Sequence, residues 1–382
     1  MTGVSPMKFI LPALAIVAVA IVCVFAFTPD QSDDPSDDIL EPPSIPESGP
    51  DDDDDVEPDP EPSTVPNGFS YSDGRLSTSD NRSVSWTVTD LLHTYMDGDS
   101  VYTPSTTGSR TISLEPGWYS VTARGQTFEL VVDGHVDRSY SWTYDTGVKK
   151  VQASVSYSIP VSDLIDDTRE NRAWNASQGD DYDFSNLPRL VRVDDTIRDL
   201  SSDLVSEYKR IGGSVSDRQG LADFIASFVQ LCMEYPVHVN GGSWDTYVWG
   251  SDEYWCVPLE TLYHGMGDCD DTAPLLCALY DAAGYDTAVG GKYGHVFSGV
   301  CIPGFMEVPE SRLDDLGIGH YSHAEREAYR GYIPGTGYIY GDILYQAVET
   351  IRDQNPVGYI AGGMDHFDRE TPWGWAGFYE VP

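Results

Sequence analysis

Lysine is scarce in this chain, and positive charge in general is rare beside negative charge. Only five of the 22 basic residues are lysines, and 62 acidic residues oppose them, so the 382-residue chain has a formal net charge of −40 at pH 7. Phosphate binding needs clustered Lys and Arg, so this composition argues against a nucleic acid partner. An acid-rich, lysine-poor surface suits high salt, where repulsion is screened, and it equally serves solubility alone.

Cysteine is also sparse, with six residues and no C-x-x-C pair, and no H-x-x-x-H spacing occurs. We therefore expect no cofactor and no catalytic metal, although Asp270 and Asp271 could alternatively help to hold a metal. A metal-dependent hydrolase is accordingly the weakest of three functional hypotheses. The four cysteines of the folded part other than Cys269 could form two disulfides or remain buried thiols.

The N-terminus carries an almost purely apolar run over residues 9–27, preceded by Lys8 and followed by a strongly acidic stretch. Its 19 residues approach the length of a membrane-spanning helix. The positive-inside rule would place residues 1–8 in the cytoplasm. We predict a signal anchor over residues 1–27 and a single-pass membrane protein with extracellular C-terminal domains. A cleaved signal peptide is the alternative.

Residues 28–66 hold fifteen acidic residues, many prolines and serines, and no Lys or Arg. A segment with so few apolar residues cannot offset the entropy of ordering, and like charges extend it. We predict a disordered acidic linker there. Residues 67–382 carry the other 47 acidic residues against 21 basic ones, so the folded part is itself acidic.

Residues 67–137 alternate apolar and polar side chains between Gly, Asp and Pro turns, as in the run GWYSVTA. This period of two predicts a small all-β module, a sandwich or barrel, that serves as a spacer or binding unit.

Residues 138–382 mix strand and helix patterns, which predicts an α+β domain. Apolar residues recur at helical spacing over 193–211, 217–235 and 270–284, and the last of these ends at Gly284. Strand patterns precede the first helix and follow the third. An insertion with one helix is expected over residues 311–332.

Three residues of this domain suggest thiol chemistry. Cys269 lies in GDCDDTAPLLCALYDAAG, directly before an apolar helical stretch, where the partial positive charge of a helix start favours thiolate. Pro274 is tolerable only in the first turn, which again places Cys269 at the helix start. His295 follows in GHVFSGV and Glu349 in YQAVETI. Nucleophile, base and orienting acid in this order are typical of acyl transfer.

These segments resemble the transglutaminase-like superfamily over residues 220–363, about a third of the chain. The resemblance depends on four pieces: LADFIASFVQLCMEY, the run from PLETLYHGMGDC to YDTAVG, GHVFSGVCI, and YQAVETI with NPVGYI. It implies a papain-like domain in which the helix carrying Cys packs on an antiparallel sheet. It also implies that Cys269 is the nucleophile, His295 the general base and Glu349 the third residue. The family usually has Asp at this last position, and Asp342 is the rival.

We therefore expect thiol-dependent acyl transfer or hydrolysis at peptide or glutamine amides, with a protein or peptide substrate such as a cell-envelope protein. The alternative is a catalytically inactive fold of the same type that acts as a cell-surface binding or structural protein.

Overall fold

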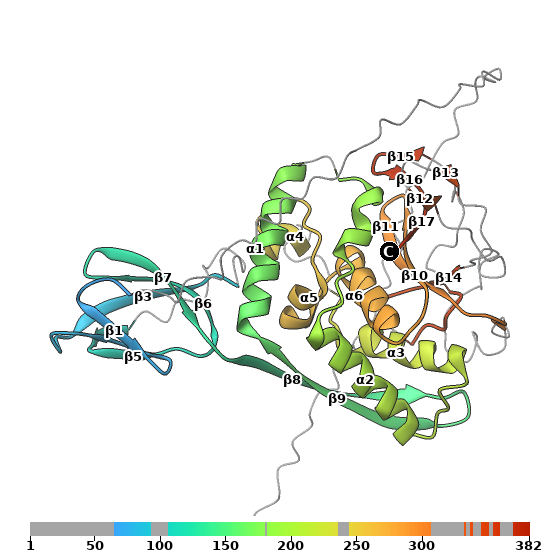
Figure 1. The fold of residues 1–382 in the computed structure, drawn as a ribbon, viewed down its shortest axis with the longest axis horizontal. Coiled ribbons are helices and arrows are strands. Elements are labelled where there is room, and N and C mark those ends of the chain that lie inside the picture. Colours follow the sequence, from blue (N-terminus) through green and yellow to red (C-terminus); the bar gives the residue numbers. More distant parts are fainter. Residues whose placement is uncertain are drawn as a thin grey trace, which may run out of the picture. The chain divides into compact units, whose positions relative to one another are not determined.

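The computed structural model in Figure 1 describes residues 65–92, 106–179, 182–235, 244–306, 332–333, 337–338, 345–350, 354–359 and 370–382. The structure is α+β with antiparallel sheets. One part of the predicted fold class needs correction, because the N-terminal transmembrane helix is not supported. Within the described ranges no helix has the length and apolar character needed to cross a bilayer. The apolar run over 9–27, nearly all of the linker, the insertion over 311–331 and Asp342 lie outside the described residues.

The first part of the described chain is a pair of antiparallel sheets. The three-stranded sheet has the order β1-β2-β5, built from Phe69–Ser72, Arg75–Thr78 and Thr111–Ser113. The four-stranded sheet has the order β4-β3-β6-β7, built from Thr106–Ser109, Val84–Asp90, Gly117–Ala123 and Gln126–Val132. The alternating side chains of both sheets form one core that includes Leu76, Trp86, Val121 and Leu130.

A long two-stranded ribbon follows, made of β8 (His135–Asp145) and β9 (Lys150–Pro160), and it begins before the predicted boundary at 137. On β9, alternate side chains from Ala153 to Ile159 are buried. This buried face packs against the helices that come next, with β9 contacting α2 and β8 contacting α3 (Figure 1).

The helices are α1 (Val161–Gln178), the 3-10 helix η1 (Phe184–Leu190), α2 (Asp195–Arg210), α3 (Arg218–Cys232), α4 (Trp244–Val248), α5 (Pro258–His264) and α6 (Cys269–Ala282). Periodicity correctly predicted α2, α3 and α6. It did not indicate α1, because the buried face of α1 includes the polar residues Thr168, Asn171 and Asn175 and therefore shows no apolar stripe.

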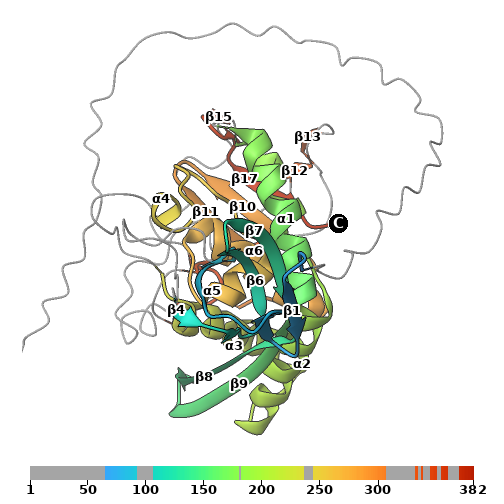
Figure 2. The ribbon, with the colours of Figure 1, turned by 90° about the vertical axis from the view of Figure 1, so that its left-hand side faces the viewer.

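A six-stranded sheet packs against α6. Its order is β13-β12-β17-β10-β11-β14, with strands Gly337–Tyr338, Tyr332–Ile333, Gly377–Glu380, Thr287–Lys292, His295–Cys301 and Tyr345–Val348. All its described pairs are antiparallel except β12 with β17. A small hairpin of β15 (Glu370–Thr371) and β16 (Gly374–Trp375) is separate. Figures 1 and 2 show α6 beside β10 and β11, and α6 also contacts α2, α3 and α5, so it is the central helix of this domain.

The polar face of α1 generates a stability prediction. The Asn171 amide donates to the Trp255 carbonyl oxygen at 2.8 Å and to Glu260 Oε2 at 2.7 Å, and all three residues are buried. Replacing Asn171 by Ala leaves both acceptors short of a donor, so the free energy of unfolding should fall by about 2–4 kcal/mol. Urea denaturation measures this. Asp166→Ala, on an exposed position of α1, is the matched control and should change stability by less than about 0.5 kcal/mol. Equal losses in both variants would contradict the role assigned to Asn171.

Candidate active site

The start of α6 is anchored by a buried carboxylate. Cys269 is the first residue of the helix, and Asp271, which is fully buried, accepts hydrogen bonds from the backbone N–H groups of Asp268 (3.2 Å) and Cys256 (2.9 Å). A Cβ added to Gly267 would lie 2.5 Å from the Cβ of Asp271, so this close approach requires glycine. The position of the thiol is therefore fixed from two segments of the chain.

The predicted helix start at Cys269 is confirmed, but the prediction that Pro274 lies in the first turn was wrong. Pro274 is the sixth residue of α6, in its second turn. Proline lacks an N–H, so the carbonyl of Asp270 has no helical hydrogen bond from that position. The helix tolerates this one loss close to its N-terminal end.

His295 and Glu349 are brought together by neighbouring strands. His295 begins β11, Glu349 follows β14, and the two strands pair with Ser298 opposite Val348. His295 Nε2 lies 2.9 Å from Glu349 Oε2. The Glu349 side chain is fully buried and that of His295 is 14% exposed. The remaining carboxylate oxygen of Glu349 accepts the N–H of Thr350 at 2.9 Å. Glu349 is thus held in place to orient the imidazole.

The pKa of His295 shows which charges surround the ring. Burial opposes the charged form, but the Glu349 carboxylate and a hydrogen bond to Cys269 outweigh it, and together they raise the pKa to about 10. Because this pKa exceeds the ordinary histidine value, the protonated ring stabilises the fold below about pH 6.5, and this contribution is lost as the pH rises through about 10. Cys269, His295 and Glu349 therefore form one interacting group.

Two side-chain hydrogen bonds connect α6 to β11 and to the segment after β14 around this group. Ser298 Oγ donates to the carbonyl of Ala273 at 2.9 Å, which ties β11 to α6. Thr272 and Thr350 share a hydroxyl hydrogen bond of 2.9 Å, which ties α6 to the segment after β14. These contacts fix the separation between the thiol and its partners.

Tyr235, which follows α3, was not identified from the sequence as a site residue. Burial raises the pKa of its phenol, and the charges of Cys269, Asp268, Asp270 and Glu349 raise it further. The phenol therefore stays protonated and can donate a hydrogen bond among these groups. No spacing rule signals it, because it lies 34 residues before the thiol. Tyr254 and Trp255, which precede the nucleophile segment, are 5% and 1% exposed and belong to the interior.

Carboxylates crowd the other side of Cys269. Asp270 Oδ1 lies 3.6 Å from the thiol sulfur, and oxygens of Asp245 and Glu253 lie close to Asp270. Neither Asp245 nor Glu253 was noted from the sequence, because they are 25 and 17 residues from Asp270 and follow no ligand spacing. The thiol of Cys269 thus lies near both the imidazole of His295 and a cluster of carboxylates.

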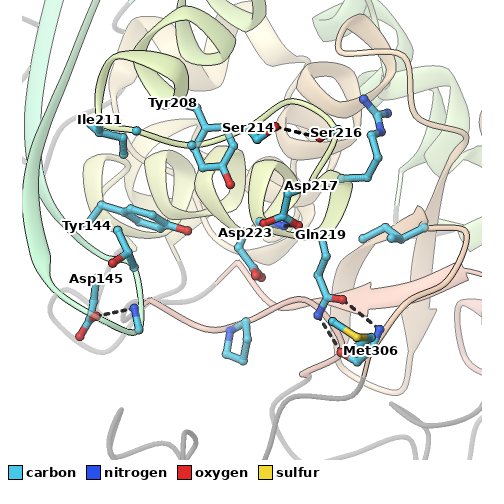
Figure 3. Close-up of a pocket in the computed structure, with 18 of the residues that line it drawn as sticks. Tyr144, Asp145, Tyr208, Ile211, Ser214, Ser216, Asp217, Gln219, Asp223 and Met306 are labelled. Atoms are coloured by element: carbon cyan, nitrogen blue, oxygen red, sulfur yellow. Dashed lines mark hydrogen bonds between the residues drawn. The ribbon is translucent and has the colours of Figure 1, made fainter.

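A cavity of about 820 Å³ lies elsewhere in the domain, between the β8–β9 turn and the start of α3 (Figure 3). Its lining includes Tyr144, Tyr208, Asp217, Asp223 and Met306. None of the three candidate catalytic residues lines it, so it is separate from the site.

Comparison with known proteins gives no relative: no family model, curated protein or solved structure matches this chain. The roles of Cys269, His295 and Glu349 therefore remain predictions that depend on the geometry of the residues themselves.

The contact between His295 and Glu349 generates a prediction. In Glu349→Gln the carboxylate that does most to outweigh burial is gone, so the pKa of His295 should fall from about 10 toward its ordinary value of about 6.5. NMR titration of ¹⁵N-histidine-labelled protein measures it. Glu115→Gln makes the same chemical change at an exposed turn and should leave the titration unaltered. An unchanged pKa in Glu349→Gln would contradict the assigned pairing.

Proposed function

We propose that this protein is a transglutaminase-like cysteine enzyme that carries out acyl transfer or hydrolysis at peptide or glutamine amides. The observation that supports it most is the His295–Glu349 contact of 2.9 Å, together with the electrostatic interaction of His295 with Cys269, the first residue of α6. A nucleophile paired with a base, which a buried acid orients, is the arrangement that activates a thiol.

In this proposal His295 takes the proton of Cys269, and the resulting thiolate attacks the carboxamide carbon. The C–S bond forms while the carbonyl π electrons move to oxygen. When the tetrahedral intermediate collapses, the C–N bond breaks and the imidazolium returns its proton to the leaving nitrogen, which departs as ammonia or an amine. Water or a primary amine then attacks the thioester carbon while His295 accepts its proton. The C–S bond breaks when this second tetrahedral intermediate collapses, and the imidazolium returns the proton to the sulfur, which regenerates the thiol. The Glu349 carboxylate stays ionised and stabilises the imidazolium.

The oxyanion of the tetrahedral intermediate requires hydrogen-bond donors that are already in position. The backbone N–H of Cys269 is the first of the helix, and the first N–H groups of a helix have no intrahelical acceptor. The protonated phenol of Tyr235 is the second donor in the proposal, since its surroundings are charged and include Cys269. The Cys269 N–H lies at the start of α6, and Tyr235 lies just after the end of α3. These two helices pack together.

Selective alkylation tests the activated thiol. Iodoacetamide at pH 7 should label Cys269 well before Cys256 and Cys277, because burial raises the pKa of both those thiols, that of Cys277 to about 12. Removing the base in His295→Ala should slow labelling of Cys269 more than about tenfold, because an unpaired thiol is only a few per cent ionised at pH 7. Peptide mass spectrometry of the full chain follows each site.

Cys256 and Cys277 serve as internal controls in the same experiment, since both should stay unlabelled unless the variant unfolds. Slow labelling of Cys269 that the His295 substitution does not change would refute the enzyme proposal and leave a binding role for the domain.

Turnover assays test Cys269 as the nucleophile and Tyr235 as a hydrogen-bond donor to the oxyanion. With a glutamine peptide as donor, ammonia release should fall about 10⁴-fold or more in Cys269→Ala. In Tyr235→Phe, kcat should fall about 10²-fold with KM little changed, because an oxyanion donor acts in the transition state. Parallel assays with and without a primary amine show whether water or the amine is the acceptor. An unchanged kcat in Tyr235→Phe would remove Tyr235 from the mechanism.

A further inference from the structure

Three carboxylates from three different segments converge behind the thiol. Asp245 belongs to α4, Glu253 to the segment before α5, and Asp270 is the second residue of α6. One side-chain oxygen from each lies within 4.8 Å of the other two. Asp245 and Asp270 are only 2% and 6% exposed. Three carboxylates so close, two of them shielded from water, repel one another strongly.

Two buried oxygens of the cluster lack a compensating contact among the described residues. There, Oδ1 of Asp245 and Oδ2 of Asp270 are buried without any hydrogen-bond donor. Glu253 receives only the indole N–H of Trp255 on Oε1, at 2.8 Å, among the side-chain hydrogen bonds of this part of the chain. No Lys or Arg of the described ranges forms an ion pair with any of the three. Buried native carboxylate oxygens normally have partners, so two unpartnered ones that converge indicate a missing positive ligand.

We propose that Asp245, Glu253 and Asp270 bind a hard divalent cation of the calcium class. Carboxylate oxygens select hard cations over zinc or copper. Oxygens up to 4.8 Å apart can share one Ca²⁺, whose bonds to oxygen are about 2.3–2.6 Å long. Water and the exposed side of Glu253 complete the coordination.

The cation connects α4 and the Glu253 segment to the first turn of α6, beside Cys269. Since Asp270 Oδ1 lies 3.6 Å from the sulfur, a cation on the other oxygen reduces the negative charge that opposes thiolate. Cation binding itself does not depend on the proposed catalysis, because its measurement requires no reactivity of Cys269.

Terbium luminescence tests the site directly. Tb³⁺ is the calcium substitute, and Trp255, bonded to Glu253, is the sensitiser. The full chain should show saturable emission that CaCl₂ displaces. Affinity should fall more than about tenfold in Asp245→Asn and in Asp270→Asn. Asp203→Asn, an exposed site on α2, removes the same charge and should bind like the wild type, so it controls for the acidic surface and linker.

Thermal melting separates loss of the site from loss of the fold. At pH 7, calcium at a hundredfold excess over its Kd should raise the Tm of the wild type by about 5 °C relative to EDTA. Asp270→Asn in EDTA should melt no lower than the wild type, because repulsion is relieved, and it should gain nothing from calcium. The proposal is overturned if the wild type gives no saturable Tb³⁺ signal, if the Asn variants bind as well as Asp203→Asn, or if NaCl of equal ionic strength reproduces the gain.

Discussion

The buried carboxylate of Asp271 is the interaction on which the candidate site depends. It accepts the backbone N–H groups of Asp268 and Cys256, and so joins the first turn of α6 to the segment that precedes α5. Two further hydrogen bonds of α6 position the partners of the thiol. Ser298 binds the carbonyl of Ala273 and so positions the strand of His295. The hydrogen bond between Thr272 and Thr350 positions the segment of Glu349. Burial raises the pKa of the Asp271 carboxyl, and the two N–H groups that it accepts oppose that shift, so these hydrogen bonds offset part of the solvation lost on burial.

Negative charge is therefore an internal constraint as well as a surface property. Cys269 lies between two environments of opposite sign, an imidazole whose pKa is raised by a buried glutamate and a cluster of acids whose pKa values are raised by burial. The thiol can be activated only if the first environment outweighs the second. This balance links the proposed catalysis to whatever neutralises the acidic cluster.

Sequence reasoning identified the elements whose signals are local. α2, α3 and α6 follow the helical period, and a cysteine before a helix is recognisable without a structure. Helix α1 was not predictable, because Asn171 and Asn175 bury side-chain amides whose acceptor, the Trp255 carbonyl, lies about 80 residues away in the sequence. Asp245 likewise meets Asp270 only through tertiary packing. The contact between Glu349 and His295 depends on the pairing of β11 with β14, which no local sequence pattern gives.

Among the described residues, the strand before Glu349 is the last named strand of its sheet, and a short segment after Pro356 bridges its outer side. The Gly358 N–H donates to the Ala347 carbonyl (2.8 Å), and the Glu349 N–H donates to the Tyr359 carbonyl (3.1 Å). Strand edges expose unpaired backbone groups that can recruit a foreign chain. Here the amide of Gln230 donates to the carbonyls of Glu349 (2.7 Å) and Asn355 (3.1 Å) and accepts the N–H of Asn355 (3.1 Å), so one side chain of α3 imitates a neighbouring strand. The Glu349 carbonyl is thereby already engaged. An extended peptide cannot be recruited there by strand addition, and the glutamate keeps its position whatever binds outside.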